Sequence, residues 1–406
     1  MKNENSFSWL HLTDLHCGTQ DYKWLWPGVR QIFFDDLRAL HDRCGPWDLV
    51  LFTGDITYTG SPEEFQEVDE ILEQLWKYLN ELGSSPKFLA VPGNHDLVRP
   101  SEKEKEEPAF ILLHQWEIQS ELQQDFWRKY FWGKANSSYL NVIQKAFENY
   151  TKWWKKLPFK PQNVNQGFLP GDFSVTIEKN GAKLGILGLN TSFLQMTADN
   201  YKGKLSLHPS QFHGVCCDSD GYRWAGQHHA CLFMTHHPPE WLNEQSVRDL
   251  KGEIVTRDNF VTHLCGHTHE TVFQEIAEAS TTPRRIWQGR SLFGLEYFGQ
   301  DYQEQRSHGY SAGKIELSGG KGTIQFWPRE ARLQGGQRRI VLDQSVRLTD
   351  EQHTEPTSFT LLQPYEKKGE PSPLNYDIKQ ETFPSNAFSN SISSFVIQRH
   401  PNPEDV

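Results

Sequence analysis

Five short segments of the sequence carry carboxylate, amide or imidazole side chains, and four of them also contain glycine or proline. In chain order they are Asp14-Leu15-His16, Gly54-Asp55, Gly93-Asn94-His95-Asp96, His236-His237-Pro238 and Gly266-His267-Thr268-His269. Carboxylate and amide oxygens and imidazole nitrogens are ligands that Mn²⁺, Fe, Zn²⁺ and Mg²⁺ accept in proteins. The segments therefore predict a metal site.

The spacing inside these segments indicates more than one ion. In an extended segment, residues two apart face the same side, so Asp14 and His16 can bind one ion together, as can His267 and His269. The carboxylate of Asp55 has two oxygens and can bridge two ions about 3.5–4 Å apart. The glycines in or beside the segments allow sharp turns that bring the ligands together.

Each segment by itself is weak evidence, because a single histidine is usually structural and Gly-Asp is a common turn. The joint occurrence of all five, in order, is what favours a metal site over the structural interpretation. Eight other histidines have no assigned partner and are interpreted as structural: His11, His41, His114, His208, His213, His228, His229 and His263.

Strand-like apolar runs precede every segment. In α/β sheets, ligands gather beyond the carboxyl ends of the strands, so the runs predict one shared site at such an edge. The runs cover residues 7–12, 48–53, 87–91, 230–235 and 261–265. Further strands are predicted at residues 173–177, 184–189, 284–288, 313–317 and 322–326, with a hairpin turn at residues 319–323. Residues 62–82 have helical spacing, and Ser61 with Glu64 fits a capping box.

The chain is expected to have three parts. Residues 1–100 and 171–330 would form the core, and residues 101–170, which are rich in Trp, Tyr and Phe, would form a helical cap insertion. Residues 345–406 are polar with recurrent Pro and Ser, which predicts a linker or tail that could join or dock on a partner.

Composition narrows the functional class. A net charge of −11 argues against broad, non-specific affinity for nucleic acid, although a few local cations and metal ions can hold one phosphate. Six cysteines without a C-x-x-C pair suggest reduced thiols in a cytoplasmic protein. We expect no signal peptide and no transmembrane helix.

Taken together, the five segments resemble the signature of the calcineurin-like metallophosphoesterase superfamily. That signature is D-x-H, then G-D, then G-N-H-[D/E], then a lone His, then G-H-x-H, and it spans Asp14 to His269 here. The resemblance covers roughly the first 330 residues. It implies a four-layer α/β/β/α sandwich of two mixed sheets, with the helical cap inserted between its halves.

The resemblance also implies a role for each residue. Asp14, His16 and His269 would hold the first metal, Asn94, His236 and His267 the second, and Asp55 would bridge the two. His95 would contact the scissile phosphate and protonate or stabilise the leaving oxygen, while Asp96 would orient His95. His236 is chosen over His237 because the family pattern is H-x-P, which leaves His237 as an outer or substrate-facing residue.

The implied reaction is hydrolysis of a phosphate ester with two divalent ions, manganese favoured. The opening residues 9–16, with residues 51–55 and 307–310, look most like prokaryotic phosphodiesterase-type members, some of which are defence-type nuclease effectors. A protein phosphatase is disfavoured because its fuller motifs are absent. The alternatives are a non-catalytic scaffold with this fold and a small-molecule or lipid phosphoesterase.

The cluster from Lys152 to Lys160 bears on the substrate. It mixes bases with Trp153 and Trp154, and such a mixture can hold a nucleotide or a strand. The competing interpretation is a solvated helix whose tryptophans face the core. We expect a phosphodiester substrate, with a nucleotide or nucleic acid favoured, and no membrane partner; the oligomeric state is left open.

Overall fold

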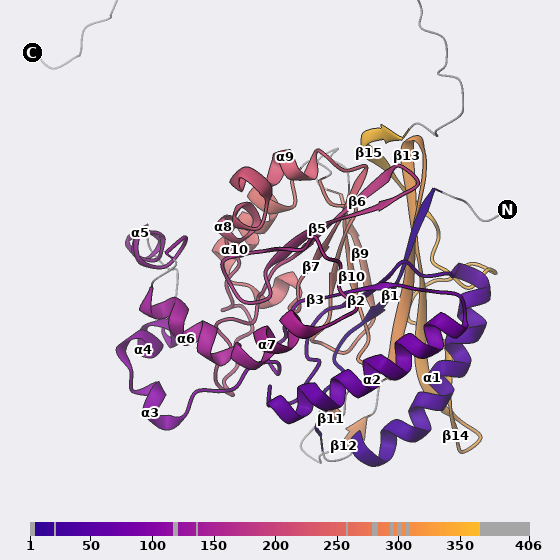
Figure 1. The fold of residues 1–406 in the computed structure, drawn as a ribbon, viewed down its shortest axis with the longest axis horizontal. Coiled ribbons are helices and arrows are strands. Elements are labelled where there is room, and N and C mark those ends of the chain that lie inside the picture. The colour runs from indigo at the N-terminus through magenta and orange to yellow at the C-terminus, as the bar shows by residue number, and fades with distance from the viewer. Residues whose placement is uncertain are drawn as a thin grey trace, which may run out of the picture. The chain divides into compact units, whose positions relative to one another are not determined.

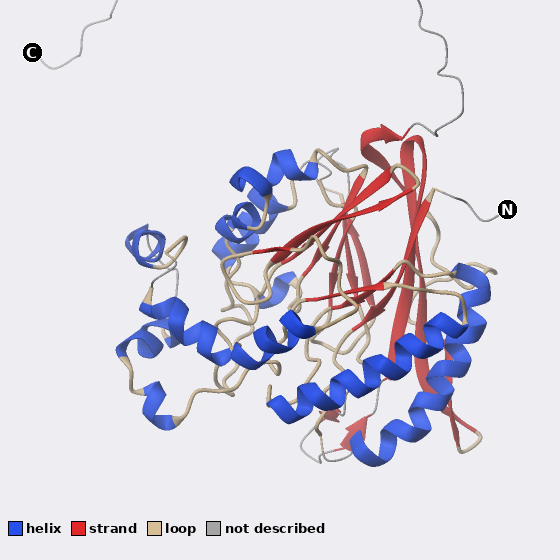
Figure 2. Ribbon diagram, in the orientation of Figure 1, coloured by secondary structure: helices blue, strands red, loops and turns tan. Residues whose placement is uncertain are grey.

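Two mixed β-sheets lie face to face with helices on their outer sides, so the expected four-layer α/β/β/α fold is confirmed (Figures 1 and 2). The computed structural model describes residues 5–19, 22–116, 121–134, 137–256, 259–277, 283–292, 296–298, 303–305 and 308–365. These residues belong to one unit, Met1–Lys367.

The first sheet has the strand order β14-β13-β1-β2-β3, with β15 also paired to β13. Its strands are β1 (Ser6–Leu12), β2 (Leu49–Phe52), β3 (Lys87–Ala90), β13 (His308–Gln334), β14 (Gln337–Leu342) and β15 (Thr357–Tyr365). The pairs β1–β2 and β2–β3 are parallel. The carboxyl ends of these three strands therefore lie at one edge of the sheet.

The long strand β13 folds back on itself at Gly319 and Gly320, as the sequence predicted. Gly313 and Phe326 both contact Trp9, although they are far apart along the strand. Gly309 lies against the carbonyl of Arg329 in the same way. Such pairing across the turn requires a hairpin, and Gly319 takes the left-handed conformation, with φ of 56°, that a tight turn needs.

The second sheet has the strand order β4-β5-β6-β7-β8-β10-β9, and β11 and β12 form a separate two-stranded ribbon. The strands are β4 (Asn165–Gln166), β5 (Phe173–Lys179), β6 (Ala182–Gly188), β7 (Ala230–Met234), β8 (Thr262–Cys265), β9 (Val272–Ile276), β10 (Arg284–Gln288), β11 (Glu296–Phe298) and β12 (Gln303–Gln305). The pairs β6–β7, β7–β8 and β8–β10 are parallel. Their carboxyl ends form a second edge that can carry ligands.

Helices cover the outer faces of both sheets. On the first sheet, α1 (Tyr22–Cys44) places Phe33 against Tyr310 of β13, and α2 (Pro62–Glu81) places Trp76 against Phe88 of β3. The chain between β6 and β8 of the second sheet supplies α8 (Pro209–Gly214), α9 (Gly221–Ala225), α10 (Glu244–Asp249) and the short helical turns η1 (Cys217–Ser219), η2 (Pro239–Trp241) and η3 (Leu250–Ile254). Helix α2 begins at the predicted capping box of Ser61 and Glu64.

The predicted helical segment contains α3 (Glu102–Lys105), α4 (Pro108–His114), α5 (Glu121–Tyr130), α6 (Ser138–Ala146) and α7 (Glu148–Lys156). Its last helix is part of the outer helical layer. The ring of Trp153 lies 5.2 Å from that of Phe65 in α2, and the Tyr150 hydroxyl donates to the Ala90 carbonyl at 3.0 Å. The segment is thus mainly helical up to Lys156, but α7 packs on the core, and β4 near the end of the segment belongs to the second sheet. The exact domain limits stay a prediction.

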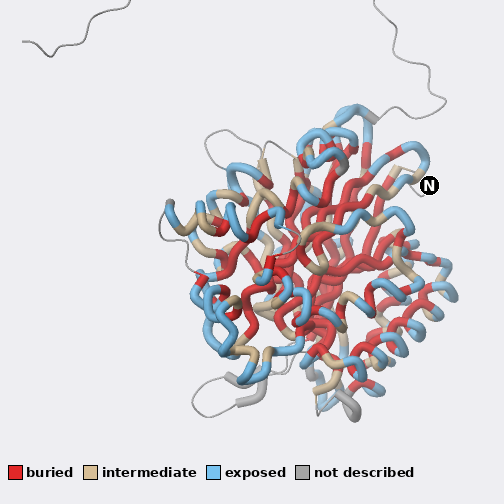
Figure 3. Tube along the Cα trace, turned by 60° about the vertical axis from the view of Figure 1, so that its left-hand side comes forward, coloured by how far each residue is buried: buried red, intermediate tan, exposed pale blue. Residues whose placement is uncertain are grey.

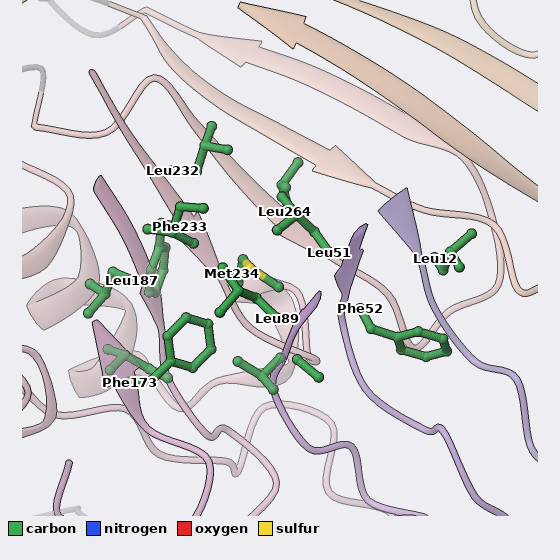
Figure 4. Packing of buried hydrophobic residues seen from close by; sticks show 14 of the residues in the cluster. Leu12, Leu51, Phe52, Leu89, Phe173, Leu187, Leu232, Phe233, Met234 and Leu264 are labelled. Atoms are coloured by element: carbon green, nitrogen blue, oxygen red, sulfur yellow. The ribbon is translucent and has the colours of Figure 1, made fainter. Parts of the chain in front are cut away.

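The core lies between the two sheets, where the strands carry the buried side chains (Figures 3 and 4). Leu51 and Leu89 of the first sheet and Met234 and Leu264 of the second are each fully buried there. At one end, the Lys179 ammonium joins the sheets, because it donates to the Asp48 carboxylate at 2.7 Å and to the Ser6 carbonyl at 3.0 Å.

The expected tail begins later than residue 345. Thr357–Tyr365 forms β15, which pairs with β13 and buries Phe359 and Leu361. Apolar and polar residues alternate only over 359–361, a run too short to predict a strand among the surrounding Pro and Ser. Residues 366–406 lie outside the described residues.

None of the helices in the described part of the chain has the length and apolar character needed to cross a bilayer.

Two truncations test where the folded unit ends. Removing residues 371–406, whose sequence lacks periodic apolar residues, should change the melting temperature by less than about 2 °C. Removing residues 345–406 deletes β15 with its buried side chains and should lower the melting temperature by about 5 °C or more. Circular dichroism melts of both variants check this. A large drop for the shorter deletion would show that the tail docks on the core.

Candidate metal centre

The nine predicted site residues lie at the carboxyl ends of β1, β2, β3, β7 and β8, and the structure brings them together. Backbone hydrogen bonds join the strand ends: Asp14 donates to the Gly54 carbonyl at 2.9 Å, and His16 donates to the Asp55 carbonyl at 3.0 Å. Within the second sheet, the Gly266 N–H donates to the His236 carbonyl at 2.9 Å, and between the sheets the His267 N–H donates to Asp14 Oδ2 at 3.1 Å. The predicted shared site at the strand ends is therefore present as a cluster.

The first group consists of Asp14, His16 and His269. The Nε2 atoms of the two histidines are 3.3 Å apart, and Asp14 Oδ1 lies 3.3 Å from His269 Nε2 and 3.8 Å from His16 Nε2. Asp14 Oδ2 accepts hydrogen bonds from Thr13 Oγ1 and the His267 N–H, but Oδ1 is buried and has no hydrogen-bond partner among the described residues. A buried carboxylate oxygen facing two imidazole nitrogens fits a cation.

The second group consists of Asn94, His236 and His267. His236 Nε2 lies 3.2 Å from Asn94 Oδ1 and 3.1 Å from His267 Nδ1. Three neutral or anionic donor atoms that converge in this way suit a second divalent ion.

Asp55 lies between the two groups and touches both through one oxygen. Its Oδ2 is 3.3 Å from His236 Nε2 and 3.9 Å from His16 Nε2, while Oδ1 accepts from the backbone N–H of His95 at 2.8 Å. The sequence predicted that the two oxygens of the Asp55 carboxylate would bridge the two ions. In the structure a single oxygen faces both groups, because the other is held by the chain.

The ligands sit on unusual backbone. Asp14, His16, Asp55, His267 and His269 have φ between 47° and 74°, and they are five of the nine non-glycine residues with positive φ among those described. The left-handed conformation costs an L-residue on the order of 1–2 kcal/mol. Because this conformation occurs at five candidate ligands, the tertiary structure must hold these residues in a backbone conformation that L-residues locally disfavour.

Close backbone approach explains the glycines of the site. A Cβ on Gly54 would lie 2.5 Å from His236 Nδ1, and Gly54 also has φ of 92°, so both space and conformation require glycine there. A Cβ on Gly93 would lie 2.0 Å from Asp55 Oδ1, and one on Gly266 would lie 2.0 Å from Thr13 Oγ1. The glycines therefore let the two sheets bring their ends into contact.

The protonation states favour metal binding. Burial lowers the pKa of His16 to about 3 and that of His267 to about 3, so both rings are neutral at pH 7 and keep a free lone pair. Burial also acts on His236, but the nearby carboxylate of Asp55 raises its pKa to about 9. A cation bound there would replace that proton, so binding would release it.

Hydrogen bonding distinguishes the two adjacent histidines. His236 Nδ1 lies 2.7 Å from the Thr53 carbonyl, which can only accept, so Nδ1 carries the proton and Nε2 is left for a metal. Both nitrogens of His237 are occupied, Nδ1 by Thr191 Oγ1 at 3.1 Å and Nε2 by Gln195 Oε1 at 2.8 Å. The geometry favours His236 as the ligand and leaves His237 as a buried neighbour.

The expected role of Asp96 is not what the structure shows. Asp96 accepts hydrogen bonds from the N–H groups of Gly93 and Thr57, both at 2.8 Å, and from Thr57 Oγ1 at 3.0 Å. The ring of His95 is instead held by the Tyr58 carbonyl, 2.8 Å from Nδ1. The Asp96 side chain thus fixes the loop, because backbone N–H groups converge on it and leave no direction towards the ring.

Several neighbours of the site gave no signal in the sequence. The ring centroid of Trp241 lies 4.0 Å from that of His267, and the ring of Tyr58 lies 5.3 Å from that of His95. Gln195 holds His237. These residues come from loops whose positions depend on packing, so only proximity in the fold could identify them. His11, taken as structural, is buried and hydrogen-bonded to Thr53 Oγ1.

Comparison with known proteins identifies a family. The sequence model of the calcineurin-like phosphoesterases matches residues 7–271, which include all nine site residues. A search of the curated proteins finds no match.

Solved structures give weaker likenesses. Purple acid phosphatase PPD1 from yellow lupin (Lupinus luteus) seeds has 10% identity and a TM-score of 0.37, with 80% of this chain and 51% of that chain covered, so this chain spans about half its length. GAP50, the anchor in the inner membrane complex of Plasmodium, has 9% identity and a TM-score of 0.36, covering 80% and 85%. Chaetomium thermophilum Vps29 has 8% identity and a TM-score of 0.28, covering 87% and 97%.

Metal content tests the assignment of ligands. Purified protein loaded with Mn²⁺ or Zn²⁺ should bind about two ions per chain, and Asp55→Ala should lose most of both, because Asp55 Oδ2 faces both groups. Elemental analysis after gel filtration measures this. Asp125→Ala, which changes an exposed carboxylate, is the matched control and should keep both ions. Two ions retained in a folded Asp55→Ala protein would contradict the bridging role.

Proposed function

Because this chain belongs to the calcineurin-like phosphoesterase family, whose activity is metal-dependent hydrolysis of phosphate esters, we propose that it is a phosphodiesterase acting on a nucleotide or nucleic acid. The observation that carries the proposal is the pair of ligand groups that meet at Asp55 Oδ2, with His95 beside them. A ring nitrogen of His95 lies within 4.8 Å of ligand atoms of His16 and Asp55.

The ligand set fits two divalent ions, for which manganese is our first choice. Asp14, His16 and His269 would hold one, Asn94, His236 and His267 the other, and Asp55 both. When bound, two such ions polarise the phosphoryl oxygens and lower the pKa of water that attacks phosphorus.

The chain supplies the remaining parts of the reaction. Asp55 Oδ1 accepts a hydrogen bond from the backbone N–H of His95. This bond fixes the bridging carboxylate relative to His95, the proposed proton donor. His95 is only partly buried, and its ring can reach a bound ester. Its proton would go to the leaving oxygen as the ester bond breaks, which prevents a strongly basic alkoxide from forming.

The substrate class rests on the surface near α7, with one correction. Trp153 and Trp154 are buried, and Trp153 donates to Asp69 at 2.7 Å, so they cannot stack on bases. Lys160 is occupied as well, because its ammonium caps the carbonyl end of α7. The aromatic face of this short helix points into the core, as the competing interpretation of the sequence had it.

Three lysines of the cluster stay on the surface. Lys152 pairs with Glu148 at 2.7 Å, and Lys152 and Lys155 line a cavity of about 370 Å³. The same cavity is lined by Gly171, which packs against Pro92, immediately before the Gly93-Asn94 loop. Lysines on a cavity whose wall reaches this loop through Gly171 and Pro92 support a path for a polyanionic substrate.

The first test concerns His95. His95→Ala should keep both ions while lowering turnover of a phosphodiester by about 10²–10⁴-fold, the usual effect of removing a general acid. Elemental analysis and initial rates on the same preparation measure the two effects. His213→Ala, a change to a histidine away from the centre, is the control and should alter neither. Loss of metal with activity would make His95 a ligand.

The second test concerns the lysines. Replacing Lys152, Lys155 and Lys156 with Ala should weaken cleavage of single-stranded DNA and flatten its salt dependence, while bis-p-nitrophenyl phosphate is hydrolysed as before. Replacing Lys103, Lys105 and Lys129 removes the same charge from other helices of the segment and is the matched control. Equal losses on both substrates would indicate a folding role. An unchanged salt dependence would exclude this path.

Two alternatives predict different results in one substrate panel. A scaffold would bind metal but release no product from any ester, in the wild type as in Asp55→Ala. A small-molecule or lipid phosphoesterase would prefer a monoester or a lipid over bis-p-nitrophenyl phosphate, cyclic nucleotides, single-stranded DNA and plasmid. We expect diesters to be hydrolysed faster than the matching monoester.

A further inference from the structure

Tyr58 is a large aromatic residue that leaves 46% of its surface exposed beside the metal centre. It follows the Asp55 turn, and its N–H donates to the Cys17 carbonyl at 2.9 Å, next to the bridge between Cys17 and Thr57. The backbone of Tyr58 is therefore tied to the turns that carry the ligands. Its ring adds little to the hydrophobic core, so its position needs another explanation.

Two separate contacts join Tyr58 to His95. The Tyr58 carbonyl lies 2.8 Å from His95 Nδ1, and the two rings stack with centroids 5.3 Å apart and an angle of 18°. A third ring also packs against His95, because the ring of His16 lies edge-on to it, with the two ring centroids 4.8 Å apart. The imidazole of His95 is thus held between an exposed tyrosine and a candidate metal ligand.

The carbonyl contact determines which nitrogen can act. A carbonyl oxygen only accepts, so Nδ1 must keep its proton, and Nε2 is the nitrogen left for the substrate. The stacked ring opposes rotation about the side-chain bonds of His95. Asp96 cannot do either, since its oxygens are taken by Gly93 and Thr57, but it does fix Thr57 immediately before Tyr58.

We propose that Tyr58 is the positioning residue of His95: its carbonyl sets the tautomer and its ring aims Nε2 at the leaving oxygen. This inference rests on the proposed function. The donor is the imidazolium form of His95, in which both ring nitrogens carry a proton. As the bond from phosphorus to the leaving oxygen breaks, the Nε2 proton moves to that oxygen, the ring is left neutral with its proton on Nδ1, and the oxygen of water forms the new bond to phosphorus. The proton lost by the water returns to Nε2, while Nδ1 stays bonded to Tyr58 throughout.

The test compares leaving groups, because proton donation matters most when the leaving oxygen is basic. A series of aryl methyl phosphates runs from 4-nitrophenol to unsubstituted phenol. Tyr58→Ala should lower kcat for the phenyl ester by about 10-fold and for the nitrophenyl ester by less than about 3-fold. Tyr58→Phe keeps the ring and the carbonyl, so it should match the wild type within about 2-fold on both. Metal content should stay at the wild-type value in both variants.

A double variant separates positioning from a general structural role. In a His95→Ala background, Tyr58→Ala should cause no further loss, because the residue on which it acts is gone. An equal loss on every ester, an equal defect in Tyr58→Phe, or a further loss in the double variant would each overturn the inference.

A readout without turnover keeps this inference distinct from the proposed function. In the zinc-loaded protein labelled with ¹⁵N-histidine, the His95 ring, assigned by its absence in His95→Ala, should show a protonated, hydrogen-bonded Nδ1. A ring protonated only at Nε2 would overturn the inference even if diesters are hydrolysed. A protonated Nδ1 in a protein that cleaves no diester would support the geometry and refute the function.

Discussion

The buried carboxylate of Asp55 needs positive charge on two sides at once, and this requirement organises the centre. Asp55 and Asp14 are buried among imidazoles, and burial keeps those of His16 and His267 neutral. Two carboxylates in such surroundings are costly unless cations balance them. The carboxylate of Asp55 raises the pKa of His236 to about 9, so this imidazole supplies part of the balancing positive charge. Asp14 Oδ1 has no hydrogen-bond partner among the described residues, so protein groups balance the negative charge of the two carboxylates only in part.

The fold meets this requirement by joining two sheets at their carboxyl ends. Parallel pairing within each sheet brings Asp14, Asp55 and Asn94 to one edge and His236 and His267 to another. Face-to-face packing then makes the two edges one site; Gly54 and Gly266 allow the contact between the sheets, and Gly93 allows the close approach of its loop to Asp55. The left-handed backbone at five ligands is a local cost that this packing sustains.

The surroundings of the centre divide into groups that hold the candidate ligands in place and rings that flank the centre. Thr53, through its carbonyl, orients His236, and Asp96 stiffens the loop that carries Asn94 and His95. Tyr58 and Trp241 contribute rings at the sides of the centre, next to His95 and His267 respectively. The helical segment contributes chiefly packing, because its tryptophans enter the core, while Lys152, Lys155 and Lys156 stay exposed.

The sequence by itself determined the family, the two mixed sheets and the identity of the candidate ligands, because motif order and apolar runs are local properties of the chain. It also predicted the capped helix α2 and the turn at Gly319 from short-range rules. Only the tertiary structure decided that one oxygen of Asp55 faces both groups, and that Tyr58 rather than Asp96 holds His95. The tertiary structure also shows the strand β15, and it shows that Trp153 and Trp154 are buried. Each of these features depends on hydrogen bonds or contacts between segments that are distant in the chain or that meet around a turn. The types of the neighbouring residues do not indicate in which direction a side chain points, so the sequence alone could not predict these contacts.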